Sequence, residues 1–97
     1  MIVPVRLYGV FRSAAGSERV EINIPIDQPT VRAVIAEITS RSDLRELKQL
    51  VLDGETRDPR PNALIMVSGR EIGTLEGLDT KLKAGDELCL LPIAHGG

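Results

Sequence analysis

Two glycines, Gly96 and Gly97, close the sequence, and their backbone is suited to chemistry at the chain terminus. Without a Cβ atom, a terminal Gly-Gly can be extended and threaded down a channel that a larger dipeptide would block. Chain ends are often small and without function. Residues 88–97, however, pass from an apolar strand through Pro92 to the glycines with no flexible spacer. We therefore expect residues 93–97 to form an extended tail whose reactive group is the carboxylate of Gly97.

Cys89 and His95 are the sole cysteine and histidine, and neither predicts catalysis by this chain. A cysteine with a histidine elsewhere can form a nucleophilic pair, but no lysine, histidine or helix start is placed to activate Cys89. A cysteine within a strand is more often a small apolar residue. His95 lies in the expected tail, where it is either a solvated spacer or a residue that a partner contacts as the tail is threaded. One cysteine and one histidine cannot complete a zinc site in a monomer, so no metal is expected.

The composition indicates a small protein with an aliphatic core. A chain of 97 residues is long enough for one domain and too short for two. It contains one tyrosine, one phenylalanine and no tryptophan, so valine, isoleucine and leucine must fill the core. A net charge of −2 argues against nucleic acid as a direct partner, because phosphate backbones need clustered positive charge. No apolar run approaches the ~20 residues of a membrane span, and no signal segment opens the chain, which favours a soluble, cytoplasmic protein.

Alternating apolar residues predict two strands in the first part of the chain. Residues 3–7 and residues 20–24 both show the period of two that is typical of a half-buried strand. Residues 13–17 between them are typical of a turn, so we expect the two strands to form a hairpin.

Two helices are expected to follow the hairpin. The first begins after Thr30, which can cap it, and its apolar residues have helical spacing. These apolar residues are Val31, Val34, Ile35 and Ile38. The second is short, with Asp43 as its expected cap and Glu46 as a capping-box partner. Its apolar residues are Leu44, Leu47, Leu50 and Val51.

The remaining elements are a loop, a second hairpin and a final strand. Residues 53–62 are polar and broken by prolines, which predicts a surface loop; an anion site at Arg57 and Arg60 is disfavoured because Asp58 lies between them. Residues 63–68 predict a strand that turns back at Gly69. A helical turn is expected over residues 77–82, a tight turn over 84–86 and the last strand over 87–91.

The last strand has two apolar faces. Alternation places Leu88 and Leu90 on one face and Cys89, Leu91 and Ile93 on the other. If Leu88 and Leu90 are in the core, the other three form an apolar patch near the tail, of the sort that marks a protein interface. The alternative is that these three side chains are covered by the long loop.

With these elements in place, the chain resembles the ubiquitin-like sulfur carriers. That family includes MoaD, the small subunit of molybdopterin synthase, ThiS, the thiamine sulfur carrier, and the archaeal ubiquitin-like small modifiers. The resemblance is carried by residues 67–72, 82–88 and 90–92 and by the terminal Gly-Gly. Residues 67–72 resemble the family's Val-Asn-Gly segment, with Ser68 in place of asparagine. The family often has a second proline after Pro92, where this chain has Ile93.

The resemblance implies an α+β architecture of the β-grasp, ubiquitin-like kind over residues 1–92. Its sheet is mixed, with four to five strands, one main helix packed across it and a short helical insertion. The resemblance also implies that an ATP-using activating enzyme adenylates Gly97, which then becomes a thiocarboxylate that delivers sulfur to molybdopterin or to a tRNA base. The chain has no Gly-rich phosphate loop, so the ATP must be bound by that partner, and no cofactor is expected on the chain itself.

Three functions remain open from the sequence. The first is the sulfur carrier, which is a substrate of the activating enzyme and no enzyme by itself, although it can be the small subunit of a complex such as molybdopterin synthase. The second is a protein modifier whose Gly97 is joined to lysines of target proteins. The third is a non-covalent interaction module whose tail is incidental.

Overall fold

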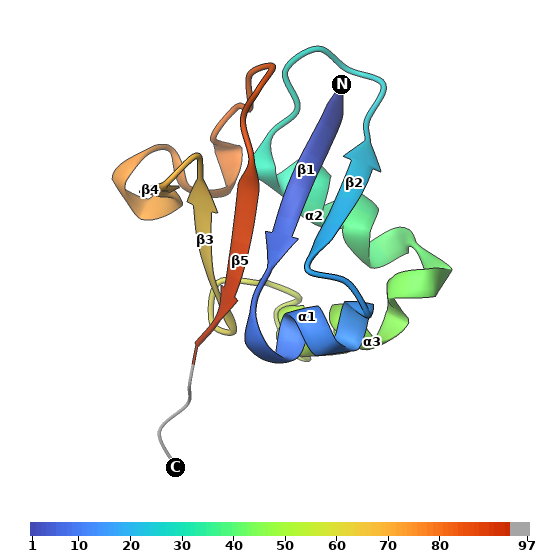
Figure 1. Ribbon diagram of the computed structural model, residues 1–97. Coiled ribbons are helices and arrows are strands. Elements are labelled where there is room, and N and C mark those ends of the chain that lie inside the picture. Colours follow the sequence, from blue (N-terminus) through green and yellow to red (C-terminus); the bar gives the residue numbers. More distant parts are fainter. Residues whose placement is uncertain (94–97) are drawn as a thin grey trace.

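The computed structural model describes residues 1–93, and residues 94–97 lie outside the described residues. Five strands form one mixed sheet in the order β2-β1-β5-β3-β4 (Figure 1). The strands are β1 Ile2–Leu7, β2 Arg19–Asn23, β3 Ala63–Val67, β4 Arg70–Glu71 and β5 Leu88–Pro92. The helices are α1 Gly9–Ala15, α2 Val31–Ser40 and α3 Arg45–Val51, with three short 3₁₀ helices, η1 Ser42–Leu44, η2 Ile72–Thr74 and η3 Gly77–Asp79.

The last strand in the sequence, β5, lies in the middle of the sheet. It runs parallel to β1, with Val5 opposite Leu88, and antiparallel to β3, with Ala63 opposite Pro92. β5 is therefore the only described strand that joins the β2–β1 pair to the β3–β4 pair.

The connection between β1 and β2 differs from the prediction. The two strands pair antiparallel, as expected for a hairpin. Residues 9–15, however, form helix α1, where a turn was expected over residues 13–17. Phe11 on this helix is fully buried, and the helix ends at Gly16, whose φ of 73° lies in the left-handed region. Burial of Phe11 explains why a segment of small and polar residues folds as a helix here.

The main helix, α2, begins as predicted. Thr30 Oγ1 accepts a hydrogen bond from the amide of Ala33 at 3.1 Å, which satisfies one of the free amides of the first turn. The predicted apolar residues of this helix are all buried; they are Val31, Val34, Ile35 and Ile38.

The second helix is present, but its predicted cap is wrong. Asp43 lies within η1, and α3 starts at Arg45 without a side-chain cap. The Asp43 carboxylate instead accepts hydrogen bonds from Arg41, with Oδ2 2.6 Å from Nη2. The guanidinium of Arg41 donates two parallel hydrogen bonds to the Asp43 carboxylate. These bonds use the oxygens that would otherwise accept from the amides of the helix start.

The second hairpin and the last strand agree with the prediction to within one or two residues. β3 ends at Val67, one residue early, because Ser68 with a φ of 47° already belongs to the turn into β4. β5 starts one residue late, at Leu88, and extends to Pro92. Helix η2 was not predicted, whereas η3 lies inside the expected helical turn.

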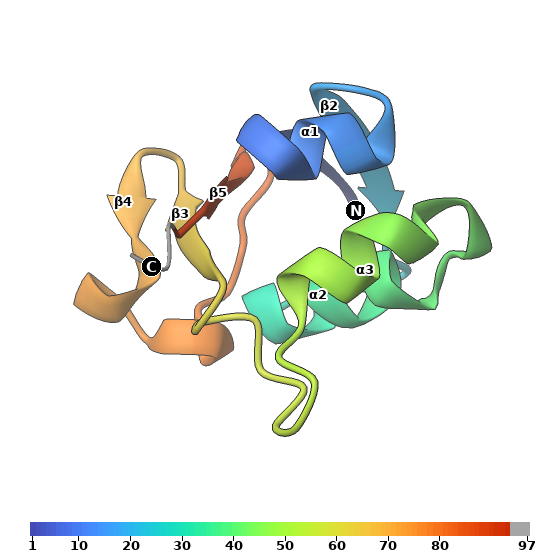
Figure 2. The same cartoon turned by 90° about the horizontal axis from the view of Figure 1, so that it is seen from below.

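The described α-helices all contribute to one core: α2 and α3 cover one side of the sheet, and α1 packs across its end, against α3 and β5. α2 lies behind the sheet in Figure 1, and the view from below shows α2 and α3 together on that side (Figure 2). The core is aliphatic apart from Phe11, as the composition predicts. The opposite side of the sheet, which faces the viewer in Figure 1, has no helix drawn across it among the described elements. Within residues 1–93, no helix is both long and apolar enough to span a bilayer.

Candidate functional site

Strand β5 separates its side chains as the sequence predicts. Leu88 and Leu90 are fully buried under the helices, so Cys89 and Leu91 must point to the uncovered face. Both are half-buried, and Ile93, one residue beyond the strand, is 41% exposed. The three residues of the predicted patch therefore lie on one face and are open to a partner.

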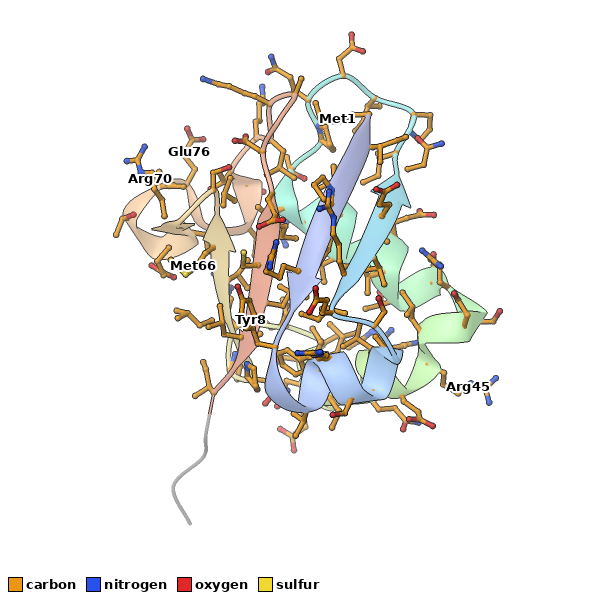
Figure 3. All side chains as sticks on the ribbon, viewed as in Figure 1. Met1, Tyr8, Arg45, Met66, Arg70 and Glu76 are labelled. Carbon is orange, nitrogen blue, oxygen red and sulfur yellow. The ribbon has the colours of Figure 1, made fainter. Side chains whose placement is uncertain are left out.

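Three more apolar residues extend this patch, and the sequence analysis did not include them. Leu64 and Met66 on β3 lie opposite Leu91 and Cys89 in the sheet register. Tyr8, just after β1, lies close enough to Cys89 for its hydroxyl to affect the thiol, and Figure 3 shows Tyr8 and Met66 on the uncovered face. Period-two alternation along residues 63–67 places Leu64 and Met66 on one face of their strand, and continuing the alternation of β1 by one step places Tyr8 on the face of Arg6. The sheet order is what brings these residues beside the predicted patch.

We call this surface the outer patch. Its six residues come from three adjacent elements of the sheet, with no helix over them among the described elements. The members are Tyr8, Leu64, Met66, Cys89, Leu91 and Ile93. Three of the six side chains, Tyr8, Leu64 and Ile93, are at least 39% exposed, and surfaces of this kind are typical of protein interfaces.

A charged pair borders the outer patch. Arg6 on β1 lies opposite Cys89, and its Nε is 3.3 Å from Glu87 Oε1. The same carboxylate oxygen lies 3.7 Å from Cys89 Sγ and accepts a weak hydrogen bond from the thiol. The patch is therefore apolar at its centre and ionic at one edge, which is the usual anatomy of a transient protein interface.

The surroundings of Cys89 keep its thiol protonated. Burial raises the pKa of Cys89 above its ordinary value, and the negative charge and hydrogen bond of Glu87 raise this pKa further. The thiolate is the nucleophilic form of cysteine. This environment therefore suits a packing residue within an interface and disfavours a nucleophile.

The two arginines of the loop over residues 53–62, Arg57 and Arg60, have different surroundings. Arg60 is bound to Asp58, with Nη2 2.6 Å from Oδ2, and these hydrogen bonds lower the pKa of the Asp58 carboxyl. Arg57 has a φ of 59°, in the left-handed region, and borders a groove of about 340 Å³ against α2. Because Asp58 neutralises Arg60, the two arginines do not form a joint anion site.

The remaining predicted site residues are in the tail. His95, Gly96 and Gly97 lie outside the described residues. What the structure does describe is the point from which the tail starts: Pro92 ends β5 opposite Ala63, and Ile93 follows directly. Within residues 1–93, no three histidine, cysteine, aspartate or glutamate side chains gather as they would around a metal ion.

The sheet order and the single main helix across it define a β-grasp protein of the ubiquitin-like class. The chain belongs to the ThiS family, whose model matches residues 5–97. This family was implied by the residues near the end of the chain, and the match extends over almost the whole sequence.

Curated relatives cover most or all of the chain. A protein of Archaeoglobus fulgidus, named as a candidate sulfur carrier protein, is 31% identical over 86 residues, which are 89% of this chain and 94% of the relative. Small archaeal modifier protein 3 of Haloferax volcanii is 28% identical over the full length of both chains. The relatives are thus a carrier and a modifier, and the chain belongs with this group of ubiquitin-like proteins.

A solved structure gives the same picture of the fold. Subunit 1 of a candidate molybdopterin converting factor from Pyrococcus furiosus superimposes with a TM-score of 0.72 and 30% identity, covering 97% of this chain and 99% of that one. A protein of this fold is therefore also found as the subunit of a larger assembly.

Proposed function

We propose that this protein is a sulfur carrier whose Gly97 carboxylate is activated by a partner and converted to a thiocarboxylate. The observation that carries the proposal is the family match, which includes residue 97. A carboxylate with a pKa of about 3.5 is ionised and unreactive as an electrophile at neutral pH, so it needs a leaving group. In the proposed reaction, a carboxylate oxygen attacks the α-phosphorus of ATP held by the partner, and pyrophosphate leaves. Hydrosulfide supplied by the partner then attacks the carbonyl carbon, AMP leaves, and the thiocarboxylate forms.

The outer patch is the proposed docking surface for the activating enzyme. It lies at the end of the sheet where β5 leads into Ile93, so a partner bound there has the tail within reach. Binding of the patch also keeps water from the acyl-adenylate, which hydrolyses if exposed. Molybdopterin or a thiolated tRNA base is the proposed destination of the sulfur, and a large synthase subunit is a proposed second partner.

The mass of the carboxyl-terminal peptide tests the carrier proposal. Protein isolated from cells without acid treatment is expected to include a fraction that is heavier by the difference between sulfur and oxygen at Gly97. Incubation with the cell's adenylating enzyme, ATP and sulfide should increase that fraction, and a Gly97→Ala variant should block it. If careful intact-mass analysis finds only the oxygen form with and without the enzyme, the carrier proposal is wrong.

A second function, protein modification, is favoured by the full-length match to a small archaeal modifier protein. Here a lysine amine of a target attacks the same acyl-adenylate, AMP leaves, and an isopeptide bond forms. High-mass adducts are expected in cells, and deletion of Gly97 should abolish them. Trypsin cuts after Lys83 and, because no lysine or arginine follows, leaves residues 84–97 on the target, so a search must use this mass.

A further inference from the structure

Helix α1 contacts the last residue of β5 through a glycine. A Cβ atom added to Gly9 would lie 3.0 Å from Pro92 Cγ and 3.6 Å from Pro92 Cδ. The φ of Gly9 is 54°, so its backbone also has the left-handed conformation that glycine adopts without strain. Gly9 therefore allows the start of α1 to pack directly on the proline ring from which the tail begins.

The loop over residues 53–62 also contacts the chain where it leaves β5. The amide of Ile93 donates a hydrogen bond to the carbonyl oxygen of Asn62 at 3.0 Å. This bond continues the β3–β5 ladder by one step beyond the Ala63–Pro92 pair. A proline at position 93 could not donate it, so the bond is a consequence of having isoleucine there.

Asn62 is itself fixed by two neighbouring segments. Its side-chain Nδ2 donates to the carbonyl oxygen of Val51, the last residue of α3, at 3.3 Å. Its backbone amide donates to the carbonyl oxygen of Pro59 at 3.0 Å. Asn62 is half-buried, and it thereby connects helix α3 and the loop to the residue that follows β5.

We propose that Gly9 and Asn62 are positioning residues that set the direction in which the chain leaves the sheet at Ile93. This inference rests on the proposed function, because the carboxylate of Gly97 must reach the ATP of an enzyme that is bound to the outer patch. The two contacts hold Pro92 and Ile93 against α1 and the loop over residues 53–62. Reactions of this kind lose rate when the reacting group is displaced by about 1 Å, even if binding is unchanged.

Amide hydrogen exchange tests the positioning without any partner. In the parent protein, the Ile93 amide should exchange more slowly than in an unstructured peptide. The variants Gly9→Ala and Asn62→Ala should speed its exchange, while the Leu90 amide in the middle of β5 reports any loss of global stability. The matched controls are Gly16→Ala and Asn23→Ala: Gly16 also has a left-handed φ, of 73°, but a Cβ there meets nothing within 4 Å, and Asn23 is an exposed strand residue.

ATP–pyrophosphate exchange with the cell's adenylating enzyme tests whether this positioning affects the rate of adenylation. We expect Gly9→Ala and Asn62→Ala to lower kcat by about tenfold and to leave KM for the carrier unchanged, because the outer patch still docks. A variant that was merely less stable would raise the apparent KM in inverse proportion to its folded fraction and leave kcat unchanged, as Gly16→Ala would.

The outcomes separate the two proposals. If the parent supports no exchange at all, the proposed function fails and this inference fails with it. If the parent is active and both variants match it in kcat, or if the Ile93 amide exchanges equally fast in the parent and both variants, the positioning role is wrong and the carrier proposal stands.

Discussion

Cys89 illustrates how the neighbours of one side chain determine its chemistry. The sequence alone favours a packing role because no activating group is nearby along the chain. The structure adds a physical reason, since Glu87, two residues away on the same strand, directs its carboxylate at the thiol. A negative charge beside a thiol disfavours the thiolate, and partial burial acts in the same direction.

Replacing Glu87 with glutamine should make Cys89 more reactive. Loss of the carboxylate removes the charge that raises the pKa of the thiol and frees Arg6, whose positive charge lowers that pKa. The pKa of Cys89 should therefore fall relative to the parent protein. The check is the rate of iodoacetamide alkylation as a function of pH: the midpoint for E87Q should lie at lower pH than for the parent. Glu21→Gln, on an exposed strand, is the control, and an unchanged midpoint in E87Q would contradict the explanation.

At the residue scale, the sequence predicted the outer patch only in part. Cys89, Leu91 and Ile93 follow from alternation along one strand. Leu64 joins them through its register with Leu91 across the sheet. Which strands are neighbours is a property of the tertiary fold, so a pattern within one segment cannot supply it. For the same reason, the contact of Gly9 with Pro92, 83 positions apart in the sequence, could not be foreseen.

At the scale of elements, α2 was predictable and α1 was not. α2 has four apolar residues at helical spacing and a threonine cap, so its local signals agree with its place in the core. α1 has seven residues and buries one large side chain, Phe11. A helix this short is not stable by itself, and tertiary packing is what keeps it folded.

The cap of α2 gives a prediction at this scale. Thr30→Ala removes the acceptor for the Ala33 amide and should lower the free energy of unfolding by about 1 kcal/mol. Thr39→Ala on the same helix is the matched control, because the Thr39 hydroxyl donates to the carbonyl of Ala36 within the helix and alanine is the better helix former there. Urea unfolding of both variants measures the difference. Equal losses of stability in the two variants would show that the cap contributes nothing.

At the scale of the whole molecule, one face of the sheet is buried and the other is the face that we propose for binding. The buried face packs against the helices, whereas the opposite face carries the outer patch bordered by Arg6 and Glu87. A substitution on the binding face should therefore affect partners much more than stability.

Two leucines of similar exposure test this division. Leu64 in the outer patch is 39% exposed, and Leu50 on α3 is 42% exposed. Leu64→Glu should weaken binding to the adenylating enzyme by about tenfold or more, because it places a charge within the proposed apolar interface. Leu50→Glu should leave binding unchanged. Titration calorimetry with the enzyme measures both, and circular dichroism confirms that each variant is folded. Equal affinities for the two variants would place the docking surface elsewhere.

The central position of β5 also has a consequence for protein synthesis. A nascent chain that ends before residue 88 has its β2–β1 pair and its β3–β4 pair with no strand between them. The sheet is completed only when β5 has emerged from the ribosome, and it then closes through contacts between the two ends of the chain, which form slowly. Any copy with the complete sheet has therefore been translated through Pro92, so a partner that selects the folded sheet does not engage fragments that end before β5 is complete.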